Sequence, residues 1–479
     1  MADRSSFTAP APLKEIVRLC ECGCVLGLTE TSPAVRRLIP RGWMMIFGFF
    51  GKKKGKAEED EEREIEPVSF QGPINGQEVN LKAHAKLVEA GLVRAKDVVT
   101  DAMALRADSV KIEPKGPGGL VTISIDGIPQ SGGKLSKPET LAITQVLKLV
   151  AGLDSKERTK PQQGGLKAEF EGKKYVLRVS STPVPEGERL LVRIQDVAQK
   201  LETLTEMGMG EPMRQRLREI LVQPGVILAV GPPGSGTTTT MFGLLKNVDS
   251  YQYTVFCMAD PGGRTLFGVS TYDDKPEGET LEDSLVRLSR KEANVILVDP
   301  VKSAAVAKPI FGKAADLTLI SEMPAKDTTS AVTQLVQVVG DAGVVANGLK
   351  ALVTQKLFRR LCPDCKAPYR PKPDFLKKLG LDESVKTLYR VPPPPDDPKE
   401  QPEPCGKCGD VGYFGRVAMF EVLEVTPGIK ELIQKGADPA AIREELKKEK
   451  QSTLQKDGLR LVAEGVTSLE ELQRVFKPA

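Results

Sequence analysis

One stretch of the chain has the residue types of a phosphate-binding loop. Its letters are GPPGSGTTT, residues 231–239, between the apolar run VILAV and the helical run MFGLLKNV. In such a loop, glycines let successive backbone amides point into one concavity, and the start of the next helix adds partial positive charge. The sequence therefore predicts a nucleotide phosphate site made by Gly231, Pro232, Pro233, Gly234, Ser235, Gly236, Thr237, Thr238 and Thr239.

The side chains that would do chemistry at this loop are incomplete. Thr237 stands where the pattern GxxxxGK[ST] has lysine, and a hydroxyl dipole replaces the full positive charge that reaches the outer phosphates. Thr238 keeps the hydroxyl expected on magnesium, and Asp299 ends the apolar run VILVD as a second candidate ligand. Pro300 follows, where a general base is usual. We expect the loop to keep its shape and hydrolysis to suffer most; a glycine-rich turn without a ligand is the alternative.

Four cysteines form two CxxC pairs, Cys362 with Cys365 and Cys405 with Cys408, separated by residues 366–404. Two such pairs can place four thiolates in a tetrahedron around zinc, and a closed four-sulfur site is structural rather than catalytic. Iron or a reduced, empty site are the alternatives. A nucleic-acid-binding knuckle is disfavoured, because the intervening loop is acidic and rich in proline.

The composition limits the remaining possibilities. The chain has 68 basic and 64 acidic residues, so no single-sign charge indicates a nucleic-acid partner. Its single histidine, His84, excludes a histidine-based active site. The grouped cysteines favour a reducing compartment, and no apolar run reaches the ~20 residues that cross a bilayer. We therefore expect a cytoplasmic protein.

The elements that position these motifs divide the chain into five predicted segments. Residues 79–200 have strand alternation and one helical run, which indicates an α+β module. The next segment alternates apolar strands with amphipathic helices, which indicates a parallel sheet covered on both faces. This second segment is predicted to end in a long helix at 348–361. The segments are a tail and linker at 1–78 (with Met45 as an alternative start), the module at 79–200, a P-loop domain at 201–361, a zinc module at 362–412 and a helical region at 413–479.

Taken together, these stretches resemble the ATPases that power type II secretion and type IV pilus assembly. The resemblance covers about residues 79–477, and it is carried by ADSVKIEP, VAGLD, LETLTEMGM, RRLCPDC, CGKCGDVGYFGRVAMFEVLEV and TLQKDGLRLVAEGVTSLEEL. It implies an α/β fold with a RecA-like P-loop domain, preceded by a smaller α+β module and followed by a zinc-binding and helical C-terminal region. It also implies a hexamer, ATP with magnesium, and protein partners of the secretion or pilus machinery at the inner membrane.

The chain departs from this family where the family does its chemistry. Besides Thr237 and Pro300, Ala259 takes the place of the glutamate before Asp260. The segment ADLTLISEMPAKD has no histidine, with Asp316 and Met323 near the positions where the family has one. Of the arginines that the family's N-terminal module directs at the nucleotide, Arg178 and Arg193 remain and Gly165 replaces another.

These departures predict a motor-type subunit that binds ATP weakly and does not hydrolyse it, acting as a scaffold or regulatory partner, for example in a ring with an active paralogue. A slow ATPase that uses Lys246 or Lys302 in place of the missing lysine is one alternative. A zinc-stabilised interaction protein that binds no nucleotide is another. No catalytic residue is assigned.

Overall fold

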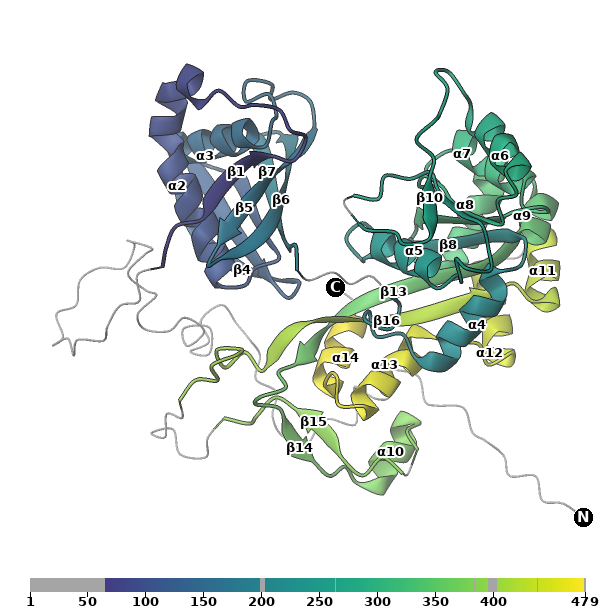
Figure 1. Cartoon of the computed structure of the whole chain (residues 1–479). Helices are drawn as coiled ribbons and strands as arrows, with labels where there is room; N and C mark the ends of the chain where they lie inside the picture. The colour runs from purple at the N-terminus through teal and green to yellow at the C-terminus, as the bar shows by residue number, and fades with distance from the viewer. Residues whose placement is uncertain are drawn as a thin grey trace, which may run out of the picture. The chain divides into compact units, whose positions relative to one another are not determined.

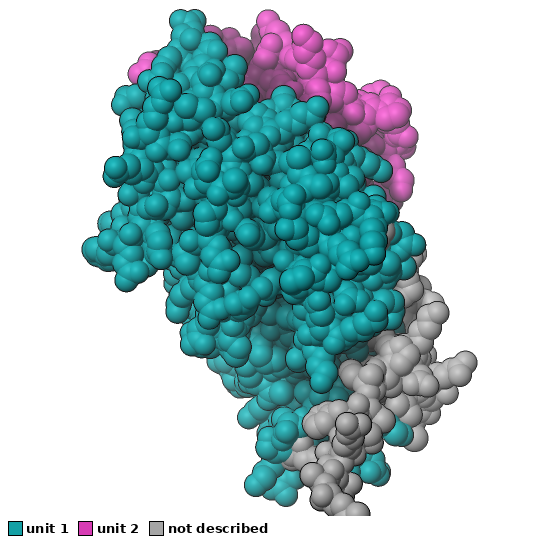
Figure 2. Space-filling view, turned by 90° about the vertical axis from the view of Figure 1, so that its right-hand side faces the viewer, with its two compact units in different colours: residues 1–27, 201–408, 412–479 teal, residues 28–200, 409–411 magenta. Residues whose placement is uncertain are grey.

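The computed structural model describes residues 65–198, 203–262, 264–382, 384–394, 403–436 and 438–477. Residues 1–64 of the predicted tail, with its alternative start at Met45, and the middle of the proline-rich loop at 391–404 lie outside these residues. The rest of the predicted tail and linker, 65–78, is not a tail, because Ser69–Pro73 form a strand that pairs with Leu166–Glu169 in the N-terminal sheet. The described chain forms two compact units (Figure 2). One consists of residues 65–198 together with 409–411, and the other contains the phosphate loop and the cysteines.

The N-terminal unit is an antiparallel sheet with two helices (Figure 1). Its strands lie in the order β1-β5-β6-β7-β2-β3-β4, and α3 packs on this sheet while α2 packs on α3. Helix α3 begins at a capping box between Ser136 and Glu139. The elements are β1 (Ser69–Pro73), η3 (Leu81–His84), α2 (Ala85–Ala104), β2 (Ser109–Lys115), β3 (Gly118–Ile125), β4 (Ile128–Ser136), α3 (Lys137–Val150), β5 (Gln162–Phe170), β6 (Lys173–Val184) and β7 (Gly187–Asp196).

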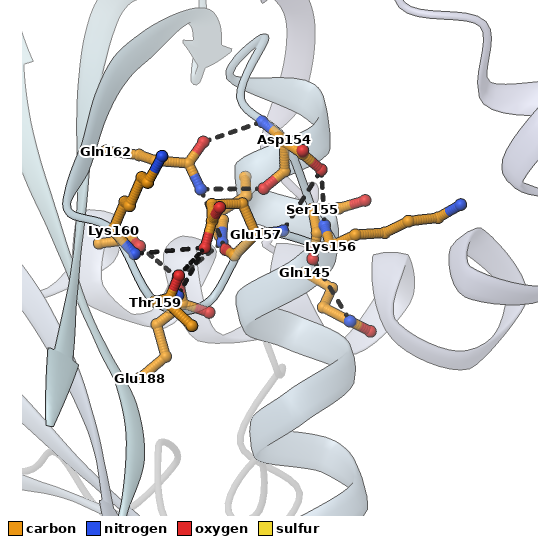
Figure 3. Close-up of polar contacts among 11 residues, drawn as sticks. Gln145, Asp154, Ser155, Lys156, Glu157, Thr159, Lys160, Gln162 and Glu188 are labelled. Atoms are coloured by element: carbon orange, nitrogen blue, oxygen red, sulfur yellow. Dashed lines mark hydrogen bonds and ion pairs between the residues drawn. The ribbon is translucent and has the colours of Figure 1, made fainter. Parts of the chain in front are cut away.

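A buried charge network fixes the segment between α3 and β5 in this unit. The Lys148 side chain is fully buried; its Nζ donates to the Glu157 carbonyl at 2.5 Å and to the Glu188 carboxylate at 2.6 Å. The hydroxyl of Ser181 donates to the same carboxylate. Around it, the side chains of Asp154, Glu157 and Gln162 bind backbone and side-chain groups of the segment (Figure 3). The buried ammonium therefore has a charged partner and a carbonyl acceptor.

The second unit is built on a sheet with the order β10-β9-β11-β12-β8-β13-β16, whose last two strands are β13 (Leu349–Leu361) and β16 (Tyr413–Glu424). Of these strands, only β16 runs antiparallel to its neighbour. The strand before the phosphate loop, β8, is buried along its whole length and lies between β12 and β13. The first elements are α4 (Glu211–Leu221), β8 (Gly225–Gly231), α5 (Thr237–Lys246), β9 (Val255–Cys257), β10 (Val269–Thr271), α6 (Leu281–Arg290), β11 (Val295–Leu297), α7 (Ala304–Gly312), β12 (Thr318–Pro324), α8 (Thr328–Val339) and α9 (Ala342–Gly348).

Both faces of this sheet carry a core, as the continuously apolar strands predict. Along β8, Val226 and Leu228 enter the core formed with α6, α7, α8 and α9, whereas Ile227 and Ala229 enter the core formed with α4 and α5. The predicted fold class is confirmed: an α/β P-loop domain of RecA-like type with a parallel sheet, preceded by a smaller α+β module.

The segment 348–361 is a strand, so the predicted long helix is wrong. Leu349–Leu361 form β13, which pairs with β8 on one side and β16 on the other. Leu352 enters one core and Val353 the other, so apolar residues on both faces imitate a helical spacing. The neighbouring strands, which are distant in sequence, override the helix propensity of Leu, Lys, Gln and Arg here.

The C-terminal region also differs from the prediction, because the segment 413–479 is not helical throughout. It begins with β16, the edge strand of the main sheet, and α11 and α12 then pack on the core beneath α8 and α9. The elements are β14 (Ala367–Tyr369), α10 (Pro373–Leu379), β15 (Leu388–Arg390), β16 (Tyr413–Glu424), α11 (Pro427–Gln434), α12 (Pro439–Lys448), α13 (Leu454–Ala463) and α14 (Leu469–Phe476).

The ribbon of β13 and β16 leads from the main sheet to the cysteines, with Leu361 paired to Tyr413 at its far end. A separate core joins this end of the ribbon to α10, α13 and α14. Among the helices of the described ranges, none combines the length and apolar character that a membrane span requires.

Candidate functional site

The loop between β8 and α5 has the backbone geometry that phosphate binding needs. Gly234 and Gly236 have φ of 86° and 93°, a left-handed conformation that favours glycine. The Ser235 amide donates to the Pro232 carbonyl at 3.1 Å, and α5 begins at Thr237. The amino end of a ten-residue helix therefore points its free amides at the loop, which supports the predicted phosphate site.

Thr238 does not meet Asp299 in this structure; it meets Glu322. The Thr238 hydroxyl donates to the Glu322 carboxylate, at 2.8 Å to one oxygen and 3.1 Å to the other. Glu322 lies near the carboxyl end of β12, opposite Ala229 of β8. The sequence reasoning missed this residue, although an acidic side chain at the end of the apolar run LTLIS is a signal for it, since carboxyl ends of parallel strands share one edge.

Asp299 lies one strand farther from the loop. It follows β11, and β12 separates β11 from β8, so its backbone is about 10 Å from the P-loop strand at ~4.8 Å per strand. The Ser321 hydroxyl donates to the Asp299 carbonyl at 2.7 Å, while the Asp299 side chain is exposed. Pro300 occupies the next position and offers no carboxylate. Glu322 is thus the acidic side chain in direct contact with the P-loop hydroxyl.

The turn after β9 contains the acidic residue Asp260, but Ala259, the residue before it, has no side chain that could act as a general base. Ala259 is buried, and the Asp260 carboxylate accepts the Gly262 amide at 2.8 Å, so Asp260 forms a local turn. Burial, with the charges of Asp299, Asp260 and Asp273, raises the pKa of the Cys257 thiol to about 11. The carboxyl end of β9 is therefore close to several acidic side chains.

Asp316 and Met323 lie at opposite ends of β12. Asp316 precedes the strand and is exposed, whereas Met323 is buried in the core close to the phosphate loop. Only the position of Met323 adjoins the loop, because Met323 pairs with Val230 of β8. A thioether there can neither accept a proton nor carry a positive charge.

Two buried polar groups near the loop have no hydrogen-bond partner among the described residues. They are the Ser235 hydroxyl and the Gln355 side-chain amide, of which neither the oxygen nor the nitrogen is bonded. Gln355 is 1 % exposed, and a methyl group placed on Gly236 would lie 3.9 Å from its Nε2. Buried polar groups are normally satisfied, so these donors fit a phosphate-bearing ligand at the loop.

The two lysines considered as substitutes differ in position. Lys246 ends α5, about 13 Å along the helix axis from Thr237 at ~1.5 Å per residue, so it lies at the wrong end of this helix to reach the loop. Lys302 is exposed and follows Asp299 and Pro300 in the connection between β11 and α7. Lys246 of α5 therefore does not place a positive charge next to Thr237.

The four predicted cysteines come together at the end of the β13–β16 ribbon. Their sulfur atoms all lie within 4.8 Å of one another, with Cys362 to Cys405 at 3.8 Å and Cys365 to Cys408 at 3.5 Å. Sulfurs that ligate one zinc ion at ~2.3 Å in a tetrahedron are about 3.8 Å apart. The donor set therefore fits a tetrahedral metal ion.

Local bonds hold the cysteines in this arrangement. The Gly412 amide donates to the Cys408 sulfur at 3.4 Å, and the Cys362 amide donates to the Gly412 carbonyl at 2.9 Å. Amides of Cys408 and Lys407 lower the pKa of Cys405 to about 7, whereas burial raises the pKa of Cys365. A bound cation would favour the thiolate form at all four sulfurs.

The N-terminal unit retains both arginines named from the sequence. Arg178 of β6 and Arg193 of β7 are paired in register, and both side chains are exposed. Gly165 of β5 lies opposite Arg178 in the neighbouring strand. This face of the unit thus carries two adjacent positive charges.

The P-loop and the parallel sheet define a P-loop α/β protein, and the four cysteines of its C-terminal region lie close enough together to hold a metal ion. Residues 85–474 match the family profile described as Type II/IV secretion system protein, and the chain belongs to that family.

Its relatives include the type IV pilus assembly ATPase PilB of Thermus thermophilus (28% identical; 94% of this chain and 48% of that protein) and PilB of Myxococcus xanthus (30% identical; 78% and 66%). Type II secretion system protein E of Dickeya dadantii is 28% identical over 79% of this chain and 74% of its own length. The chain thus spans about half to two thirds of the two PilB proteins. The solved ATPase DotB of Legionella pneumophila aligns with 80% of this chain and 95% of its own, at 14% identity and a TM-score of 0.49.

Proposed function

We propose that this chain is a motor-type subunit of a type II secretion or type IV pilus assembly machine that binds ATP weakly and does not hydrolyse it. The single observation behind the proposal is the composition of the phosphate loop: its backbone geometry is complete, while Thr237 stands at the lysine position. Such a subunit would serve as a scaffold or regulatory partner, with nucleotide as a ligand.

The loss of hydrolysis follows from several missing groups. Thr237 removes the charge that stabilises the outer phosphates, and Pro300 removes a carboxylate that could act on water. If each lost group costs about 2.7–4 kcal/mol, as one oxyanion-hole donor does, the chemical step slows by several orders of magnitude. The loop amides of residues 231–239 and the hydroxyl of Thr238 would still hold the phosphates and the magnesium ion. Asp299 would act on the magnesium through water.

We further propose that the four cysteines hold a structural zinc ion. The sulfur separations of 3.5 and 3.8 Å support zinc, and a site with four protein ligands leaves no open position for a substrate. The metal would fix the end of the β13–β16 ribbon. The Lys366 ammonium, which donates to the Gly465 carbonyl at 2.8 Å, would connect this end to the turn after α13.

The proposed partners are secretion or pilus machinery proteins at the inner membrane, and the proposed assembly is a hexameric ring, either of this chain alone or shared with an active paralogue. The names of the relatives, type IV pilus assembly ATPase and type II secretion system protein E, support this partner class. A cytoplasmic protein peripheral to the membrane would meet such partners, and no nucleic acid is required.

Turnover and binding measured on the same preparation test the proposal. We expect calorimetric titration with magnesium ATP to show weak binding and a phosphate-release assay to show no turnover above buffer. Turnover that disappears in Thr237→Ala or Asp299→Ala would overturn the non-hydrolysing function. Turnover lost in Lys302→Ala would instead support the slow ATPase. The absence of binding heat, with destabilisation by a chelator alone, would support the interaction protein without nucleotide.

A further inference from the structure

The contact between Thr238 and Glu322 places a negative charge at a loop whose backbone has the geometry of a phosphate-binding loop. Both Glu322 oxygens lie within 3.1 Å of the Thr238 hydroxyl. Thr237 contributes no compensating positive charge. A carboxylate close to bound phosphates repels them, and this repulsion is large in a partly buried site. Glu322 therefore disfavours binding of the free nucleotide anion.

A divalent cation removes this conflict. Magnesium is usually held by one or two carboxylates together with substrate phosphates and water, and the hydroxyl of a P-loop threonine is one of its ordinary ligands. The Thr238 hydroxyl and the Glu322 carboxylate are already in direct contact, at 2.8 Å. With the ion between carboxylate and phosphates, the same charge that repels free ATP would attract its magnesium complex.

Gln355 provides independent evidence that a ligand belongs at this loop. Gln355 lies on β13, which borders β8 on the side opposite β12, and its side chain is buried. Neither Nε2 nor Oε1 of this side chain has a hydrogen-bond partner among the described residues. Its Nε2 lies near Gly236 of the loop. Leaving such an amide unpaired is unfavourable, and an acceptor oxygen at the loop would satisfy its N–H groups.

We propose that Glu322 and Thr238 form a divalent-cation site, so that the loop accepts a nucleoside triphosphate only as its magnesium complex, with the Gln355 amide as a neutral donor to the phosphates. This inference rests on the nucleotide-binding part of the proposed function and is independent of whether hydrolysis occurs. It assigns the metal to a carboxylate on β12, whereas the sequence pattern pointed to Asp299 on β11.

Binding measurements on the full chain test this site. ATP affinity is measured by calorimetry in magnesium and in EDTA for the unmodified protein, for Glu322→Gln and for a control variant, Glu277→Gln, whose side chain is exposed between β10 and α6. We expect the unmodified protein and Glu277→Gln to bind at least about tenfold tighter with magnesium than in EDTA. Glu322→Gln keeps an oxygen acceptor for Thr238, and we expect its magnesium affinity to fall by about 10–100-fold while its affinity in EDTA rises.

A second variant and a direct metal probe keep the test decisive. Gln355→Leu should weaken binding in both buffers and keep their ratio, because it removes a phosphate donor and no metal ligand. Titration of manganese and a non-hydrolysable ATP analogue, followed by the spin resonance of free manganese, should show tighter ion binding to the unmodified protein than to Glu322→Gln.

Three results would overturn the inference. The first is that the ratio of the ATP affinities in magnesium and in EDTA is the same in Glu322→Gln as in the unmodified protein. The second is that Glu322→Gln binds magnesium ATP more tightly than the unmodified protein, which would show that Glu322 only hinders binding. The third is that the unmodified protein does not bind magnesium ATP. Hydrolysis by the unmodified protein would contradict the proposed non-hydrolysing function alone.

Discussion

The four-cysteine site and the phosphate loop belong to the same compact unit but differ in what they retain. At the cysteine site, all four donor atoms are present, lie within 4.8 Å of one another and are positioned by backbone bonds. At the loop, the backbone is in place and the strong charge is missing, with Thr237 at the lysine position and the Gln355 amide unpaired.

The comparison teaches that the backbone of the phosphate loop keeps its shape without a lysine at position 237. The shape of the loop depends on glycines, amide hydrogen bonds and the flanking β8 and α5, all of which are local or part of the core. The four-cysteine site differs, because a bound metal ion would hold its ligands together and would thereby stabilise the fold, so the loss of one cysteine should destabilise it.

The largest expected effect is at the cysteine site. Replacing Cys408, which is buried, by serine removes one of four proposed zinc ligands and leaves three thiols close together. Because structural zinc binding is worth about 10–16 kcal/mol in small zinc domains, we expect loss of bound zinc and a lower melting temperature. Elemental analysis of the purified protein and thermal unfolding with and without a chelator measure both effects.

Cys257→Ser is the matched control, because Cys257 is also buried but lies at the end of β9 in the core, away from the four cysteines. It should keep the zinc content and its response to chelator. Equal zinc content in Cys408→Ser and the unmodified protein would show that the quartet is not the metal site.

A smaller effect is expected at Lys148 of the N-terminal unit, the second place where a buried group has its partners. Lys148→Met leaves the Glu188 carboxylate buried, with only the Ser181 hydroxyl close to it. Removing one partner of a buried pair typically costs about 3–5 kcal/mol, and we expect a loss of this size in the free energy of unfolding. Urea unfolding followed by circular dichroism measures it.

The double variant Lys148→Met with Glu188→Leu separates the charge from the packing. It removes both charges, so most of the lost stability should return. If the double variant is as unstable as Lys148→Met alone, the buried ion pair is not the cause. An exposed pair, Lys435 with Glu431, offers a further reference, since Lys435→Met should change stability by less than about 1 kcal/mol.

Much of this architecture could be predicted because its signals are local. The apolar run VILAV, the glycines after it and the CxxC spacings each lie within a few residues, and they identified β8, the phosphate loop and the cysteine quartet. Parallel strands buried on both faces have a recognisable apolar pattern, which is also present in the run VILVD that contains β11.

The errors and omissions concern partners that are distant in sequence. Leu349–Leu361 has good helix formers, and only pairing with β8 and β16 makes it a strand. Glu322 and Thr238 are 84 residues apart and meet because β12 lies next to β8. Gln355 becomes a buried donor at the loop only once β13 is placed on the other side of β8. Composition and spacing carry no information on such a strand order.

An effect smaller than those at Cys408 and Lys148 is expected when a positive charge is introduced into the phosphate loop. Thr237→Lys returns a positive charge to the first position of α5, where the family pattern has lysine. A hydrogen bond to a charged group contributes about 1.5–3 kcal/mol, so we expect magnesium ATP to bind roughly 10–100-fold tighter, as measured by calorimetry. Thr237→Gln, which is long but neutral, should gain little. Turnover should remain absent, since Pro300 still offers no carboxylate; equal affinities of the lysine and glutamine variants would show that charge is not what separates this loop from an intact one.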